Sequence, residues 1–177
     1  MSERIRLFFE CLTKWRYQES GDLAEAECIA IQDFGQGKEQ TPGISNVALA
    51  KLALRLIKLK NFPIIAQQQT ALVLDNCRNV IHIIESENYL NTWQVMQETA
   101  KVIKSRGFSK VIIIAHPMHV WRVNKHCQKL SLVPIIPYDL EKIPFDPASS
   151  QWWTRSAFLW IIRELPIRIY CLLRGYI

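Results

Sequence analysis

The chain has 177 residues, of which 49% are apolar and 21% charged, proportions that fit one globular domain and exclude extended disorder. Basic residues outnumber acidic ones by 22 to 16, which gives a net charge of +6. This excess indicates an anionic partner and does not by itself distinguish nucleic acid, a membrane or a phosphorylated small molecule.

The first half of the chain alternates between predicted helices and strands. Apolar residues recur at three- and four-residue steps over residues 3–18, which predicts an amphipathic helix. Short apolar runs predict buried strands at residues 27–31 and 63–66. Between the two strands, a glycine-containing loop leads to a helix predicted over residues 45–60, for which Ser45 is the expected N-cap.

The second half continues the same alternation. A third strand is predicted at residues 80–84, followed by a helix over residues 91–106. Residues 110–115 are rich in Ile and Val and form the clearest predicted strand. A helix at about residues 118–129 and a strand at residues 132–136 complete the pattern.

The C-terminal part is predicted to be a polar loop over residues 139–150 and then a Trp-rich helical tail, residues 151–177, interrupted at Pro166. Continuously apolar strands that alternate with helices favour a mainly parallel sheet of about five strands, covered on both faces. We therefore expect an α/β fold, a three-layer α/β/α Rossmann-like sandwich. One domain would span residues 1–177, with its N-terminal helix within residues 1–20.

In such folds ligands bind beyond the carboxyl ends of the strands. The polar residues that follow the predicted strands, or open the next helices, are Asp33, Glu85, Asn91, Thr92, His116, His119 and Arg122. Helix N-termini and an arginine favour negative charge. The sequence therefore predicts a cleft for a small anionic ligand that carries a phosphate or a nucleotide.

Two of these residues are candidates for proton transfer. His119 is the first, because only histidine titrates near neutral pH without a perturbing environment. Its alternative role is to orient the following helix. Glu85 is the second, because burial at the end of an apolar strand would suit a carboxyl group to this task. The alternative for Glu85 is an ion pair that holds Arg122 toward the ligand.

The other five residues are candidates for ligand binding. Arg122 would clamp a phosphate or carboxylate through its forked guanidinium. Asn91 and Thr92 would cap the helix and add ligand contacts. Asp33 would hold a ribose or be an ordinary loop residue, and His116 follows its strand in a position where a structural role is also expected.

One combination of these residues could imitate a metal site. His116, His119 and Glu85 would make a set of two histidines and one carboxylate. No HExxH motif or further dedicated ligand accompanies them. We therefore expect no metal.

The same residues carry a resemblance to a known family. Glu85 precedes the Asn91-Thr92 pair, and an apolar strand then leads to His119-x-x-Arg122. This combination resembles the SanA/ElyC/YdcF family, a domain of unknown function. The resemblance implies a Rossmann-like fold and a link to envelope biogenesis. Because the chain has no anchor-like segment, it resembles the soluble branch of the family, for which S-adenosylmethionine is the implied cofactor.

The resemblance covers about residues 25–177. Ser45 before an Ala- and Leu-rich helix is similar to the family's second element. Glu164, followed by Tyr170 and Gly175, resembles its C-terminal helix and tail.

The chain departs from the family pattern in its turns. A glycine-rich turn is replaced by residues 32–37, a second Gly pair by residues 67–69, and a Thr by Ala115. Glu85 also lies one residue too early, so Glu87 is a rival for the family glutamate. Because glycine turns let backbone approach phosphate, these departures weigh against a nucleotide or adenosyl cofactor. They favour, as the alternative, a binding or regulatory module without catalysis.

Other partners are less well supported by the sequence. Basic residues are dispersed and no nucleic-acid-binding motif occurs, so no nucleic acid is expected. Charges and a proline within residues 157–173 argue against a membrane-spanning helix, while the aromatic and arginine-bearing tail leaves contact with a membrane surface as an alternative. Five cysteines without a CxxC motif predict reduced thiols and a cytoplasmic protein.

Overall fold

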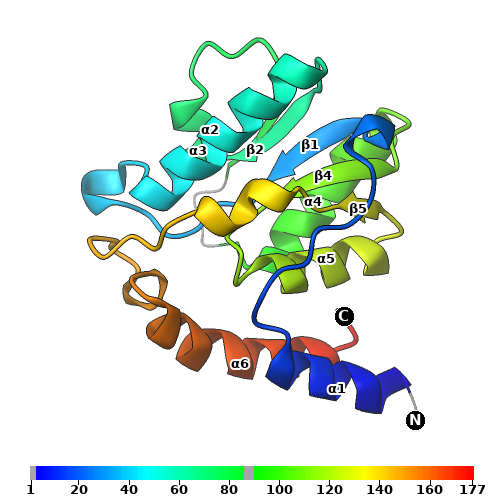
Figure 1. Ribbon diagram of the computed structural model, residues 1–177, viewed down its shortest axis with the longest axis vertical. Coiled ribbons are helices and arrows are strands. Elements are labelled where there is room, and N and C mark those ends of the chain that lie inside the picture. The colour runs from blue at the N-terminus through cyan, green and yellow to red at the C-terminus, as the bar shows by residue number, and fades with distance from the viewer. Residues whose placement is uncertain (1–2, 86–89) are drawn as a thin grey trace.

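The structure is a computed structural model that describes residues 3–85 and 90–177. Every strand pairing in its five-stranded sheet is parallel, and the strand order is β3-β2-β1-β4-β5. The strands are β1 (Cys28–Ile31), β2 (Ile64–Gln67), β3 (Val80–Ile84), β4 (Lys110–Ile114) and β5 (Val133–Ile135). Helices cover both faces of the sheet, so the predicted three-layer Rossmann-like sandwich is confirmed (Figure 1).

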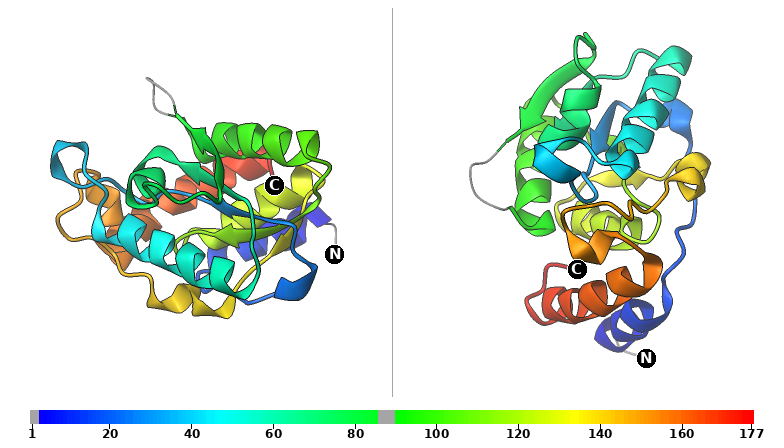
Figure 2. Two further views of the ribbon diagram at one scale, coloured as in Figure 1. Left: turned by 90° about the horizontal axis from the view of Figure 1, so that it is seen from above. Right: turned by 90° about the vertical axis from the view of Figure 1, so that its left-hand side faces the viewer.

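The described residues form six α-helices. They are α1 (Glu3–Thr13), α2 (Ile44–Leu59), α3 (Gln68–Val73), α4 (Thr92–Ser105), α5 (Val120–Lys129) and α6 (Ala157–Leu173). Helix α2 packs on β1 and β4 from one side of the sheet, while α4 and α5 pack on β3, β4 and β5 from the other. Helices α1 and α6 pack side by side beyond α5 and lie outside the three layers (Figures 1 and 2).

The central strands are buried because both of their faces are apolar. Residues 28–31 of β1 and residues 111–114 of β4 are at most 1% exposed. These two strands are neighbours, and Ile31 pairs with Ile114 at their carboxyl ends. The order of the strands reverses between β1 and β4, and such a switch point opens a crevice at the carboxyl edge of the sheet. The fold therefore places the loops after β1 and β4 beside each other.

The predicted N-cap of α2 is wrong. The cap residue is Gly43, and the buried Ser45 hydroxyl instead donates a hydrogen bond to the carbonyl of Pro144, at 2.8 Å. The Ile44 N–H is bound by the carboxylate of Asp146, at 3.1 Å. A side chain from a distant loop thus satisfies the helix end, which a local capping pattern does not reveal.

The predicted break at Pro166 is also wrong, since α6 continues through this residue. The proline removes one hydrogen bond, the one to the carbonyl of Ile162. Both Pro166 and Ile162 are exposed, so water can bind that carbonyl. The first helix is shorter than predicted and ends at Thr13, and the short helix α3, after β2, was not predicted.

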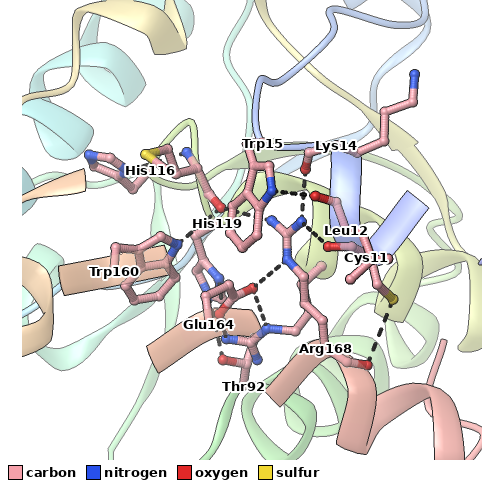
Figure 3. A network of polar contacts seen from close by, with 12 residues as sticks. Cys11, Leu12, Lys14, Trp15, Thr92, His116, His119, Trp160, Glu164 and Arg168 are labelled. Atoms are coloured by element: carbon pink, nitrogen blue, oxygen red, sulfur yellow. Dashed lines mark hydrogen bonds and ion pairs between the residues drawn. The ribbon is translucent and has the colours of Figure 1, made fainter. Parts of the chain in front are cut away.

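A buried ion network joins α6 to the sandwich (Figure 3). Glu164 on α6 accepts two hydrogen bonds from Arg122 on α5, one from Nε at 2.9 Å and one from Nη2 at 2.8 Å. It accepts a third from Nε of Arg168, at 3.2 Å. Glu164 and Arg168 are completely buried and Arg122 is 5% exposed. The carboxylate is therefore held between two guanidinium groups inside the protein.

Arg168 extends this network to α1. Its guanidinium donates hydrogen bonds to the carbonyls of Cys11, Lys14 and Met118, at 3.4, 2.8 and 3.2 Å. The same group lies 4.1 Å from the ring centroid of Trp15, as a cation on an aromatic face. One side chain thus ties the N-terminal helix to α6 and to the loop before α5.

We predict that Glu164→Gln destabilises the fold strongly. The substitution keeps the shape of the side chain and leaves two buried arginines without this carboxylate, which typically costs about 3–5 kcal/mol of unfolding free energy. Urea unfolding followed by circular dichroism measures the loss.

The matched control is Glu98→Gln, which removes an exposed carboxylate paired with Lys101 at 2.7 Å. Its cost should stay below about 1 kcal/mol. Equal small effects of the two substitutions would show that the buried network is not holding the structure together.

Candidate functional site

A cleft with two arms opens at the switch point of the sheet. One cavity has a volume of about 230 Å³ and the other about 370 Å³. The residues that line both cavities are Asp33, Gly35, Thr92, His119 and Gln151. Because these residues are shared, the two cavities form one continuous site. We call the smaller cavity the aromatic arm and the larger one the amide arm.

The aromatic arm is lined mainly by rings and two arginines. The rings are Phe34, Trp93, Trp153, Trp160, Tyr170 and Tyr176, and the arginines are Arg122 and Arg163. The guanidinium of Arg163 lies 5.0 Å from the ring centroid of Trp153. The C-terminal tail therefore forms one wall of the site. The sequence pattern predicts a packing role for the tail residues Trp153, Trp160 and Tyr170, and their density was the available signal of a further role.

The amide arm lies over the carboxyl ends of β1 and β2. Six of its lining residues are glutamines, namely Gln32, Gln36, Gln67, Gln68, Gln69 and Gln151. Sequence reasoning placed residues 67–69 after a strand without assigning them a role. A row of amides supplies hydrogen-bond donors and acceptors without charge.

Asp33 follows β1 and holds the start of α3 in place. Its carboxylate accepts hydrogen bonds from the N–H groups of Gln69 and Thr70, at 2.8 and 2.9 Å. Its own N–H donates to Oε1 of Gln67, at 2.8 Å. Burial raises the pKa of Asp33 to about 6, although these hydrogen bonds act in the opposite direction. The predicted loop aspartate is thus a capping group, and Asp33 also lines the cleft.

The turn after β1 is fixed by a buried side chain of α2. Asn46 accepts a hydrogen bond from the Phe34 N–H at 2.8 Å and donates one to the carbonyl of Gly35 at 2.9 Å. Gly35 has a φ of +75°, and a Cβ at this position would lie 2.4 Å from Oγ1 of Thr154. This one position of the turn requires glycine.

His119 lies between Arg122 and Thr92 (Figure 3). Nη2 of Arg122 is 3.4 Å from Nδ1 of the imidazole, and Nε2 is 3.4 Å from Oγ1 of Thr92. Since a guanidinium only donates, Nδ1 is the acceptor and Nε2 carries the hydrogen. Burial, and then the positive charge of Arg122, hold the pKa of His119 well below 6.5. At neutral pH the imidazole is therefore uncharged and donates toward Thr92.

His116 lies in the core next to the cleft. Its ring stacks on Phe34 with centroids 3.9 Å apart and lies 4.2 Å from the ring of Phe145. Burial lowers its pKa to about 3. Among the described residues that line the two arms, His116 is absent, and its position supports packing.

Glu85 differs most from its expected environment. It is exposed just after β3, so the burial expected for this carboxyl group is not found. Among the described residues, it lines neither arm. The carboxylate that pairs with Arg122 is that of Glu164 rather than Glu85. The rival Glu87 lies outside the described residues.

Asn91 caps α4 as its sequence predicts. Its side chain accepts a hydrogen bond from the Gln94 N–H at 3.1 Å, and its own N–H donates to the Gln94 side chain at 3.0 Å. This capping box places Asn91, Thr92 and Trp93 on the wall of the aromatic arm. The N-terminus of α4 thus adjoins the cleft.

Comparison of the chain with protein-family models, with curated proteins and with solved structures finds no match. The part of the chain that the structure describes contains no group of three or more His, Cys, Asp or Glu side chains that could hold a metal ion. Across the same residues, no helix has the length and apolar character needed to cross a membrane.

We predict that stability falls as the pH decreases from 6.5. Burial lowers the pKa of His116 to about 3, that of His126 to about 4, and that of His119 well below 6.5. Below pH 6.5 the histidines bind protons in the unfolded chain but not in the folded chain. Each histidine therefore lowers the free energy of unfolding by up to about 1.4 kcal/mol for every unit by which the pH falls. Asp33 offsets one of them, because its raised pKa lets the folded state bind a proton between about pH 6 and pH 4.

Near pH 5 the unfolded chain therefore binds about two more protons than the folded chain, and the free energy of unfolding changes by about 3 kcal/mol per pH unit. Urea unfolding between pH 5 and 7 measures this slope. His116→Phe keeps the ring stacked on Phe34 and should reduce the slope by one proton. A stability that is constant over this range would contradict the neutral, buried histidines.

Proposed function

We propose that the chain binds a small ligand with an oxyanion, such as a phosphate, in the two-armed cleft. The observation that carries the proposal is the direction of the hydrogen bonds through His119. Arg122 donates to Nδ1, and Nε2 donates to the hydroxyl of Thr92. The hydroxyl hydrogen of Thr92 is then left to donate into the cleft. A relay that ends in a donor fits a ligand atom that only accepts.

Two further features support an anion. The N-terminus of α4 adjoins the aromatic arm through Thr92 and Trp93, and the dipole of this helix favours negative charge there. Arg163 also lines this arm. Basic residues also outnumber acidic ones by 12 to 4 over residues 101–177, the half of the chain that supplies His119, Arg122 and Arg163.

The same relay defines what His119 would contribute to a reaction. A neutral imidazole whose Nε2 carries hydrogen cannot accept a proton from the ligand at that atom, so it is poorly suited to act as a base. It would stabilise negative charge that develops on a ligand oxygen. A binding or regulatory module without turnover uses the same contacts. The resemblance to the SanA/ElyC/YdcF family makes S-adenosylmethionine one of the compounds to test.

A thermal-shift screen with inorganic phosphate, nucleotides, sugar phosphates and S-adenosylmethionine tests the proposal. A ligand present at 100 times its Kd should stabilise the protein by about 2.7 kcal/mol, which corresponds to a rise in Tm of about 5–10 °C. Thr92→Val keeps the shape of the side chain, removes the terminal donor of the relay, and should abolish most of this rise.

The control is Thr99→Val on the same helix, whose hydroxyl is bonded to the carbonyl of Val95 inside α4. This variant should keep the full ligand-induced shift relative to its own baseline. If Thr92→Val leaves the ligand-induced rise in Tm unchanged, the anion binds elsewhere and the proposed site is wrong.

A further inference from the structure

We infer that the amide arm is a subsite for an uncharged, hydroxyl-rich group, so that the ligand is a sugar phosphate or polyol phosphate. The inference rests on the proposed function, because the phosphate is assigned to the Thr92 donor. It adds the chemical class of the remainder of the ligand.

The two arms differ in the basic side chains that line them. Arg122 and Arg163 line the aromatic arm, whereas no Lys or Arg occurs among the described residues that line the amide arm. A phosphate would therefore gain no cationic partner among these residues. Amide groups offer one acceptor and two donors each, and hydroxyl groups both donate and accept. The chemistry of the amide arm thus matches hydroxyls better than a phosphate.

Gln32 provides the most specific sign of a missing partner. It is 2% exposed and lines the amide arm directly after β1. Its Nε2 is buried without a hydrogen-bond partner among the described residues. Leaving such a donor unsatisfied costs about 1–3 kcal/mol. Of the four buried side-chain atoms without a hydrogen-bond partner among the described residues, it is the one whose residue lines the cleft. A small turn of the Gln32 side chain toward the amide arm would let this amide donate to a ligand hydroxyl.

Other groups of the amide arm are already held in place. The amide of Gln69 is assigned the orientation that satisfies both of its polar atoms, in which the nitrogen donates to the carbonyls of Gln40 and Thr41, at 3.1 and 3.2 Å, and the oxygen accepts from Nε2 of Gln36 at 3.3 Å. Asp33 is held by the backbone of α3, and each of its carboxylate oxygens can accept a second hydrogen bond. A carboxylate beside fixed amides offers acceptors to several hydroxyls at once. These groups need little reordering when a ligand binds.

Isothermal titration calorimetry with two classes of phosphate monoester tests the inference. The first class is hydroxylated (hexose, pentose and glycerol phosphates), and the second is not (phenyl and butyl phosphate). At least one hydroxylated ester should bind the full-length protein about tenfold more tightly than either plain ester, since one or two buried hydrogen bonds are worth this factor.

Gln32→Met keeps the length of the side chain and removes its amide. It should weaken the hydroxylated ester about tenfold and leave phenyl phosphate unchanged. Gln68→Ala removes an exposed amide of the same arm. It should also weaken binding of the hydroxylated ester, and it tests the inference if Gln32→Met impairs folding. Gln97→Met, on the exposed side of α4, is the matched control and should change neither affinity.

The outcomes separate the inference from the proposed function. Plain esters that bind as tightly as hydroxylated ones, with no effect of either amide substitution, would overturn the sugar subsite while leaving an anion site that depends on Thr92. Failure of both classes to bind would overturn the proposed function together with the inference.

Discussion

The carboxylate of Glu164, held between Arg122 and Arg168, fixes how the outer helices pack on the sandwich. Three helices that lie far apart in the sequence meet at this carboxylate, because Arg122 belongs to α5, Arg168 to α6, and Arg168 in turn binds the backbone at the end of α1. Burying charges is costly unless every one of them is paired and hydrogen-bonded. The network therefore permits essentially one relative position of these helices, and α6 supplies a wall of the cleft in that position.

This constraint also changes the role of Arg122. Its sequence position suggested a clamp that reaches for an anion, whereas its guanidinium is bonded at two points to Glu164 and oriented toward His119. In the proposed site, a side chain held in this way would act on the ligand through His119. It fixes which nitrogen of His119 carries hydrogen and disfavours the protonated imidazole. Arg122 thus sets the protonation state of His119 from outside the proposed binding position.

The layers of the fold could be predicted because they depend on local pattern. Continuously apolar runs identify buried parallel strands, and the position of Asp33 or His119 after a strand locates the cleft. Contacts made over long sequence separations could not be predicted in this way. Asp146 caps α2 from 102 residues away, and Glu164 meets Arg122 across 42 residues. Glu164 and Arg168 lie one turn apart in a largely apolar segment that also carries Arg163. This was the available sign of a buried ion pair, since apolar segments rarely carry charge without a partner.

The amide arm was hidden for a different reason. Glutamines after a strand are ordinary loop residues in sequence, and only the fold brings Gln151 from the tail beside Gln32 and Gln67. In the structure these side chains line one polar cavity beside the switch point of the sheet.

The protonation state of His119 tests the central claim most directly. Nitrogen-15 NMR of the imidazole at pH 7, assigned by comparison with His119→Gln, distinguishes the two neutral tautomers and the imidazolium. We predict a neutral ring with hydrogen on Nε2, the state that leaves the Thr92 hydroxyl free to donate into the cleft. A protonated imidazolium, or a neutral ring with hydrogen on Nδ1, would contradict it.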